Sequence, residues 1–295
     1  MLVRSVRTAI HLGLLLSLAS ACTEEKSKFQ PTPGPTPGPT GPTAPLAANA
    51  EARDYSTYTK VVWADEFDGS TLDPNKWEYE VKDTWYNNEL QATTNRVDNL
   101  VVTGGYLNII ARREAYNGKQ YTSARIVTRG KRDFEYGRYD VRAKMPTGKG
   151  LWPAAWMLGS DLRAWPACGE IDIAELRGSA PARNLTTMHF GVDAAGHRQA
   201  GTTYTLPNAS PTNTLATDFH LYTVVRSLDK MRFYLDGVEY YSFGPNNASP
   251  YPFNNPFYAI LNVAVGGDFD GNPDGTTVFP QTMQVDYVRF SQYPQ

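Results

Sequence analysis

Three acids within six residues, Glu170, Asp172 and Glu175, carry the most distinctive chemistry of this sequence. Their segment alternates acidic and apolar residues, the pattern of a β-strand with one face in a core and the other exposed. Glu170 and Asp172 therefore share a face, and a β-bulge near Ala174 would return Glu175 to it. Carboxylates this close repel each other, so at least one should hold its proton to unusually high pH. A carboxylate beside a carboxylic acid is the pair that retaining glycoside hydrolysis requires.

The spacing of the two glutamates sets a condition on their strand. With one residue absorbed by the bulge, four strand steps separate the Cα atoms of Glu170 and Glu175 by about 13 Å. The carboxyl groups of a retaining pair lie roughly 5–5.5 Å apart. Both side chains must therefore lean toward each other, which a concave, bulged sheet allows and a flat sheet does not.

Three tryptophans just upstream, Trp152, Trp156 and Trp165, distinguish this segment from an ordinary strand with an acidic, solvated face. Aromatic rings beside acids suit sugars, whose axial C–H groups stack on a ring while their hydroxyl groups bond to polar side chains. Core packing is the alternative role for a tryptophan, and we expect it for one of the three.

Short strands are the elements that must position these residues. Alternation within Arg138–Met145 and Met231–Leu235 separates apolar from polar faces, and Asp236-Gly237 is a two-residue hairpin signal. No helical period longer than two turns stands out after the first 21 residues. About 235 residues of strands without helices predict one all-β domain, a sandwich or barrel, over residues 58–295.

The N-terminal part resembles an export and anchoring segment. Residues 1–21 combine a charged start, an apolar run too short to span a membrane and a small-residue exit. The sequence Leu18–Cys22 resembles a bacterial lipobox, which predicts lipidation of Cys22, although an ordinary signal peptidase site fits as well. Residues 22–57 include the Pro-, Gly- and Thr-rich stretch 31–45, an extended spacer that predicts a tether. We therefore expect an exported protein, either membrane-anchored through this lipid or secreted.

Composition adds little to the function but excludes some classes. The net charge of −2 is unremarkable, and no basic run indicates nucleic-acid binding. If Cys22 is lipidated or removed, Cys168 has no disulfide partner. No histidine lies near Cys168 in the sequence, so we expect a small buried residue rather than a nucleophile. We also expect a monomer.

The segment Trp165–Glu175 resembles the signature of glycoside hydrolase family 16 in its bulged, laminarinase-type form. Eight further segments resemble the same family in the expected order, so the resemblance extends from about Val61 to Phe290. They are Val62–Phe67, Asn87–Gln91, Tyr121–Ile126, Tyr136–Pro146, Asp218–Tyr222, Phe233–Gly237, Leu261–Gly267 and Val285–Arg289. One departure is Arg226, where the family commonly has tryptophan.

This resemblance implies a jelly-roll sandwich of two curved antiparallel sheets, with the acidic strand in an open concave cleft. A cleft open at both ends implies attack within a polymer rather than at its tip. By resemblance, Glu170 is the nucleophile that forms a glycosyl-enzyme intermediate. Glu175 protonates the leaving oxygen and then activates water, and Asp172 between them modulates the charge of the pair.

The resemblance also implies substrate-binding residues. Trp152, Trp156 and Trp165 line the glycone subsites, and His189 matches a family histidine near the acids. The residues alone leave a hydrogen-bonded core histidine equally open for His189. Further candidates for contacts with sugar hydroxyl groups are Asn88, Glu89 and Arg125.

Catalysis requires no cofactor, but the resemblance implies a structural calcium ion away from the cleft. Asp286 shares a strand parity with Val288 and Phe290, and an acid on an apolar face needs a partner. The implied ligands are Asp286 with oxygens from Glu66 and Gly105, and such oxygens suit a hard cation. The alternative is that Asp286 caps a loop or pairs with an arginine.

The leading functional hypothesis is retaining endo-hydrolysis of β-1,3-glucan such as laminarin, with mixed-linkage β-1,3-1,4-glucan as a second substrate. A hydrolase of a marine galactan such as agarose is an alternative within the same family. A non-catalytic, glycan-binding surface lipoprotein and a transglycosylase are further alternatives. The complete trio of acids argues against a binding protein, which has no need of three mutually repelling carboxylates.

Overall fold

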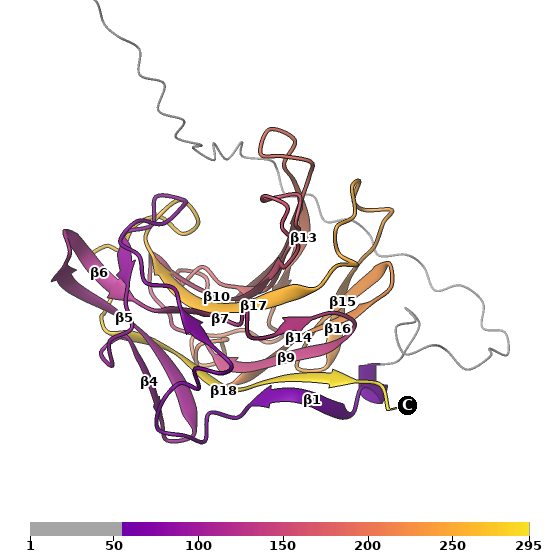
Figure 1. Cartoon of the computed structure of the whole chain (residues 1–295). Helices are drawn as coiled ribbons and strands as arrows, with labels where there is room; N and C mark the ends of the chain where they lie inside the picture. Colours follow the sequence, from indigo (N-terminus) through magenta and orange to yellow (C-terminus); the bar gives the residue numbers. More distant parts are fainter. Residues whose placement is uncertain (1–54, 295) are drawn as a thin grey trace, which may run out of the picture.

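The computed structural model describes residues 55–294, which form two stacked β-sheets and one short 3₁₀ helix (Figure 1). The elements in chain order are η1 (Tyr55–Thr57), β1 (Lys60–Asp65), β2 (Glu78–Tyr79), β3 (Gln91–Thr93), β4 (Leu100–Thr103), β5 (Tyr106–Tyr116), β6 (Lys119–Ser123), β7 (Arg125–Val127), β8 (Asp133–Phe134), β9 (Gly137–Lys144), β10 (Leu151–Gly159), β11 (Glu170–Glu175), β12 (Arg183–Phe190), β13 (Arg198–Thr205), β14 (His220–Ser227), β15 (Lys230–Leu235), β16 (Val238–Phe243), β17 (Phe257–Val265) and β18 (Gln281–Gln292).

The two sheets are built almost wholly from antiparallel pairs. The larger sheet follows the order β16-β15-β14-β9-β18-β5-β6-β3, with β1 paired to β18 and β4 to β5. The smaller sheet follows β13-β12-β11-β10-β17-β7-β2, with β8 paired to β17. Among the described residues, β3 and β6 form the one parallel pair. This arrangement confirms the predicted all-β sandwich and excludes the closed barrel.

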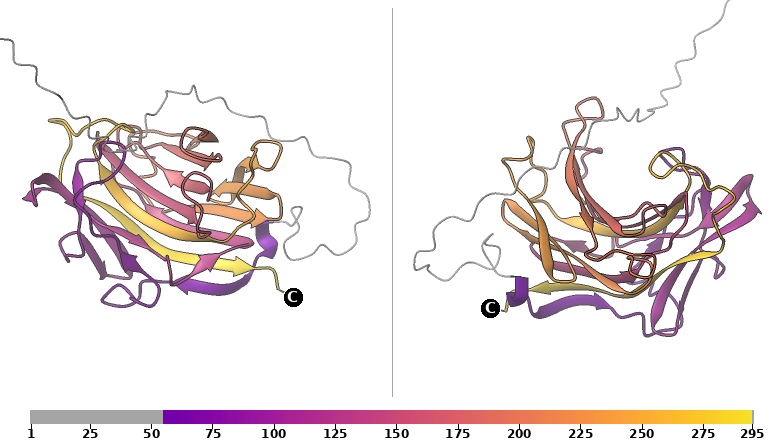
Figure 2. Two further views of the ribbon diagram at one scale, coloured as in Figure 1. Left: turned by 45° about the horizontal axis from the view of Figure 1, so that its top comes forward. Right: turned by 180° about the vertical axis from the view of Figure 1, so that it is seen from behind.

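The smaller sheet is curved, and its edge strand β13 rises steeply at one side of the molecule (Figure 1). Figure 2 shows the same curvature from two further directions, with the larger sheet forming the layer beneath. The acidic strand β11 lies two places from β13, separated from it by β12. Ile171 and Ile173 of β11 lie in the core between the sheets, so the acids that alternate with them belong to the opposite, concave face.

Burial fixes the face that each strand presents, as β10 shows. Leu151, Ala155 and Met157 are fully buried between the sheets, whereas Trp152 and Trp156 are half-buried on the opposite face. Burial of a leucine or methionine side chain contributes about 1.5–3 kcal/mol. A shift of one residue would expose this apolar set, so the register is strongly specified and the tryptophans must take the concave face.

Arg226 of β14 is buried and binds main-chain oxygens of neighbouring segments. The side chain is only 2% exposed and donates hydrogen bonds to the main-chain oxygens of Phe134, Phe253 and Asn255, at 2.8, 2.8 and 2.5 Å. Its guanidinium also lies 4.5 Å from the ring centre of Phe257. Burial lowers the pKa of Arg226 to about 10. The departure from tryptophan therefore serves packing between loops and not the acidic cluster.

The predicted signal segment 1–21, Cys22 and nearly all of the tether 22–57 lie outside the described residues. At the predicted start of the folded domain, Tyr58 is buried and packs with Val225 and Tyr234. Between residues 55 and 294, no helix has the length and apolar character needed to cross a membrane.

Candidate active site

The acidic strand β11 contains the bulge that its sequence predicts. Against β10, the register moves by one residue between Asp172 and Ala174, so Ile173 is extra. Against β12, the register is irregular between Asp172 and Glu175. Ile173 and Ala174 are buried in the core, and the extra residue returns Glu175 to the face that carries Glu170.

Two indole N–H groups hold the two predicted catalytic glutamates. Trp165 donates from Nε1 to Oε2 of Glu170, and Trp152 donates from Nε1 to Oε1 of Glu175, each at 2.9 Å. These contacts place both tryptophans in the acidic cluster. None of the three predicted tryptophans is fully buried, but Trp156 comes nearest to the expected core role because it packs on a small apolar cluster of β7 and β17.

His189 lies beside the acids and not in the core. It is paired with Glu170 across β11 and β12. Its Nε2 lies 3.2 Å from Oδ2 of Asp172 and 3.8 Å from Oε1 of Glu170. A nitrogen that carries a proton at this point stabilises negative charge on both carboxylates.

The surroundings of the three acids raise their pKa values. Burial, followed by the charge of Asp172, raises the pKa of Glu170 to about 7, while His189, Trp165 and Arg125 act in the opposite direction. Burial and the charge of Asp172 also raise the pKa of Glu175, and this displacement is large. Burial raises the pKa of Asp172 well above its ordinary value as well. Each of the three acids therefore keeps its proton to a higher pH than an exposed carboxyl group does, as a general acid requires.

Arg125, predicted to contact sugar hydroxyl groups, is enclosed by aromatic rings. Its guanidinium lies 4.6 Å from the ring centre of Trp85 and 4.7 Å from that of Trp156. Its Nε donates to Oε2 of buried Glu80 at 2.6 Å. The indole N–H of Trp156 donates to Oδ1 of Asn262 at 2.7 Å. Arg125 therefore packs between two tryptophans on the concave face, and its Nε is occupied by the hydrogen bond to Glu80.

Asn88 and Glu89 lie on the loop before β3. Asn88 donates from Nδ2 to the carboxylate of Asp268 at 3.0 Å, which joins this loop to the loop after β17. Glu89 accepts a hydrogen bond of 2.6 Å from Nε2 of Gln91. Burial raises the pKa of Glu89, and the charge of Arg125 partly offsets this. Within the described part of the chain, neither residue forms a hydrogen bond with the three acids, so their role toward a sugar stays a prediction.

Two residues of the site escape the sequence analysis. Phe269 stacks on Trp152 with ring centroids 4.4 Å apart and planes inclined by 17°. His197 lies within hydrogen-bond distance of His189. Both lie on loops that are distant from β11 along the chain. The only sequence signals are an aromatic residue shortly after Gly266-Gly267 and a second histidine across a short turn.

Cys168 is buried, as the sequence predicts. Burial and the charge of Glu170 raise the pKa of its thiol to about 11. A thiol with so high a pKa stays protonated at neutral pH and is a poor nucleophile.

Asp286 does not lie on the apolar face of β18, so that prediction is wrong. The register between β18 and β9 shifts at this point, which places Val288 and Phe290 in the core and leaves Asp286 partly exposed at the bulge. Its Oδ2 accepts a hydrogen bond of 2.5 Å from Nη1 of Arg142. Pairing with an arginine, the alternative interpretation, is what the structure shows.

The other two predicted calcium ligands are Glu66 and Gly105. Glu66 forms two hydrogen bonds of 2.8 Å with Arg289, and Gly105 lies in the turn between β4 and β5. An arginine pairs with each carboxylate, so a calcium ion bound by these side chains would have to displace that arginine. Calcium binding stays a prediction from the family resemblance alone.

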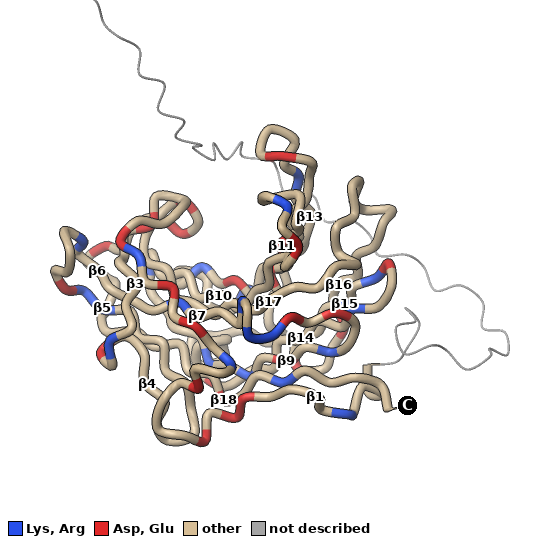
Figure 3. The backbone as a smooth tube through the Cα atoms, in the orientation of Figure 1, with Lys and Arg blue, Asp and Glu red and all other residues tan. Residues whose placement is uncertain are grey.

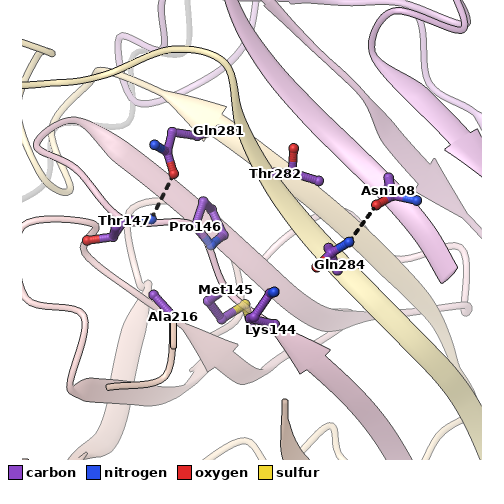
Figure 4. Close-up of a pocket in the computed structure, with 9 residues that line it drawn as sticks. All are labelled: Asn108, Lys144, Met145, Pro146, Thr147, Ala216, Gln281, Thr282 and Gln284. Atoms are coloured by element: carbon purple, nitrogen blue, oxygen red, sulfur yellow. Dashed lines mark hydrogen bonds between the residues drawn. The ribbon is translucent and has the colours of Figure 1, made fainter. Parts of the chain in front are cut away.

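A pocket of about 370 Å³ lies on the larger sheet, between β9, β18 and β5 (Figure 4). Its lining is mostly polar but contains no acid, and Gln284 donates to Oδ1 of Asn108 at 3.0 Å across it.

Figure 3 shows lysine and arginine interspersed with aspartate and glutamate along the described backbone. The candidate active site is the concave face of the smaller sheet, because it carries Glu170, Asp172 and Glu175.

Known proteins are similar to this chain in sequence and in fold. The chain is 41% identical over 261 residues to the beta-glucanase of Rhodothermus marinus, covering 81% of this chain and 87% of that protein. It is 40% identical over 286 residues to glucan endo-1,3-beta-glucosidase A1 of Niallia circulans, covering 84% of this chain but 41% of that protein. The chain thus spans less than half the length of that relative.

A solved structure agrees with these relatives. The laminarinase catalytic domain from Thermotoga maritima MSB8 superposes with a TM-score of 0.73 at 37% identity, covering 80% of this chain and 98% of that domain. The family described as Glycosyl hydrolases family 16 matches residues 77–289. This chain therefore belongs to glycoside hydrolase family 16.

Proposed function

We propose that this protein hydrolyses β-1,3-glucan such as laminarin. It cleaves bonds inside the polysaccharide chain and retains the configuration of the anomeric carbon. The observation that carries the proposal is the bulged strand β11, which gathers Glu170, Asp172 and Glu175 on one face. Family membership and the relatives named for 1,3-glucan hydrolysis support the substrate class. Mixed-linkage β-1,3-1,4-glucan is the second substrate we propose.

In the first step, the carboxylate of Glu170 attacks the anomeric carbon and forms an ester bond to it. The glycosidic C–O bond breaks, and the proton of Glu175 passes to the leaving oxygen. The displaced part of the polymer then departs with a free hydroxyl group. Trp165 and His189 direct N–H groups or positive charge at Glu170, which favours the ionised nucleophile.

In the second step, water attacks the same carbon. Glu175, now a carboxylate, takes a proton from this water while the ester bond to Glu170 breaks. The indole N–H of Trp152 stabilises the carboxylate form of Glu175 between the two steps. Two inversions give net retention, and both glutamates return to their starting protonation states.

Reducing-sugar release from laminarin, mixed-linkage β-glucan and agarose tests this proposal. We expect release from laminarin, and we expect Glu170→Gln to abolish it while laminarin binding persists. Release from agarose alone would move the substrate to a galactan. Absence of release with laminarin still bound would favour the glycan-binding alternative, and substantial turnover by Glu170→Gln would overturn the nucleophile assignment.

We also propose, from the sequence alone, that residues 1–21 direct export and that Cys22 carries a lipid anchor. The lipobox-like residues before Cys22 and the spacer after it support this proposal. Cells that express Cys22→Ser should release the enzyme into soluble fractions, whereas the native protein should sediment with membranes. Equal partition of the two proteins would contradict the anchor.

Structural calcium is a separate proposal that rests on the family resemblance. Removal of a bound calcium ion with a chelator should lower the Tm more than the activity at room temperature. An unchanged melting curve in chelator would contradict it.

A further inference from the structure

His197, at the end of the turn between β12 and β13, contacts two of the groups that surround the proposed nucleophile. Its Nε2 lies 2.9 Å from Nδ1 of His189, and its ring packs on Trp165 with centroids 4.6 Å apart. His189 faces Asp172 and Glu170 through its other nitrogen, and Trp165 donates to Glu170. His197 thus supports both of the neighbours that stabilise charge on Glu170.

The turn that carries His197 is built for close approach. Gly191 has a φ of +147°, and a Cβ atom there would lie 2.4 Å from the main-chain oxygen of Gly196. Only glycine allows the two arms to come this near. The N–H of Gly196 also donates to Oδ1 of Asp193 at 2.7 Å. The backbone therefore holds His197 at a fixed position beside His189.

We propose that His197 is a positioning residue that holds His189 with its Nε2–H directed at Asp172 and Glu170. This inference rests on the proposed function, because it concerns the stabilisation of the nucleophile. Two imidazole nitrogens at hydrogen-bond distance must pair one donor with one acceptor. Nε2 of His189 faces the carboxyl groups of Asp172 and Glu170 at 3.2 and 3.8 Å, which favours a proton on that nitrogen. With that proton in place, His197 either donates to Nδ1 of a neutral His189 or accepts from Nδ1 of a protonated one.

The surroundings of His197 suit this role. Burial and the neighbouring His189 lower the pKa of His197 to about 4, so its ring is neutral near pH 7 and can act as donor or acceptor. A neutral partner adds no second positive charge that would compete with His189 for the acids. The ring of His189 lies 5.1 Å from that of His197, with planes inclined by only 12°, so the two rings restrict each other's rotation.

Three variants separate hydrogen bonding from packing. His197→Phe keeps an aromatic ring on Trp165 but removes the hydrogen bond, whereas His197→Gln keeps an amide that can donate or accept. We expect His197→Phe to lower kcat on laminarin about tenfold, with KM within about twofold, and to raise the apparent pKa of the acidic limb of kcat/KM. His197→Gln should retain kcat within about threefold. His220→Gln, on β14 of the larger sheet, is the matched control.

Two kinetic outcomes would overturn the proposal. One is a His197→Phe variant with native kcat and a native acidic limb. The other is a His197→Gln variant as impaired as His197→Phe, because packing and not hydrogen bonding would then be responsible. Melting curves of all variants identify any loss of folding.

Nitrogen NMR of the native protein, labelled with ¹⁵N-histidine, tests the inference without any measurement of activity. We expect His189 to carry a proton on Nε2 at pH 7, and a His189 protonated on Nδ1 alone would overturn the proposal. If the native protein hydrolyses none of the glycans, the proposed function fails, while this spectrum still decides the state of His189.

Discussion

The indole N–H of Trp152 lies 2.9 Å from Oε1 of Glu175, the residue that must alternate between acid and carboxylate. An N–H donor favours the carboxylate form, because it stabilises negative charge on the oxygen. The opposite influence comes from burial and Asp172, which raise the pKa of Glu175. Phe269 stacks on Trp152 and holds the donor in place.

Trp152→Phe should therefore impair catalysis through Glu175. The variant keeps an aromatic ring against Phe269 but loses the N–H donor. We expect kcat on laminarin to fall about tenfold or more, since a hydrogen bond to a charged group contributes about 1.5–3 kcal/mol. The alkaline limb of the pH profile should also move upward, because Glu175 loses a group that stabilises its ionised form. Trp63→Phe, in the core near Phe134, is a suitable control, and an unchanged kcat would count against the assignment.

The acidic limb of kcat/KM should report Glu170. The nucleophile must be ionised, and burial with Asp172 raises its pKa to about 7. Activity should therefore fall as pH decreases through a value displaced upward from 4.5 toward about 7. Initial rates on laminarin from pH 3 to pH 9 measure this limb. A limb below pH 4.5 would show that the free enzyme does not raise the pKa of its nucleophile.

Stability should depend on pH through the same residue. The folded-state pKa of Glu170 lies above the unfolded value, so its contribution is fully present below about pH 4.5 and is lost as pH rises through about 7. Glu170→Gln removes this loss. The free energy of unfolding of the variant, relative to that of the native protein, should therefore increase by an amount on the order of 1–3 kcal/mol from pH 4 to pH 8. Melting curves at both pH values should show the Tm difference moving in the same direction. Glu239→Gln, at an exposed position of β16, is the control, and a pH-independent difference would contradict the prediction.

Arg226→Met should destabilise the fold without altering the acidic cluster directly. The variant leaves three main-chain oxygens without their buried donor, those of Phe134, Phe253 and Asn255. Each unsatisfied buried group costs about 1–3 kcal/mol, so we expect a loss of about 3 kcal/mol or more and a Tm lower by about 6–12 °C. Thermal melting measures the effect. Arg198→Met, an exposed change on β13, should shift the Tm by far less.

Local pattern was sufficient to predict the catalytic strand. The alternation of acids with Ile171 and Ile173 indicated a strand with one buried face, and the extra residue before Glu175 indicated a bulge. Both features depend on residues adjacent in the chain, where strand periodicity alone decides the face. The all-β sandwich was predictable for the same reason, because several segments, such as Arg138–Met145 and Met231–Leu235, alternate in the same way.

Contacts between distant segments required the tertiary structure. His197 and Phe269 meet the acidic cluster from separate loops, and no local period marks them. Asp286 appeared to face the core because strict alternation was assumed, but a bulge against β9 turned it toward Arg142. The sequence by itself determined which residues carry the acid chemistry, since strand parity is a local property. Only the tertiary structure decided which side chains hold those acids, because hydrogen bonds and ring contacts across sheets and loops depend on how the curved sheet brings separate strands together.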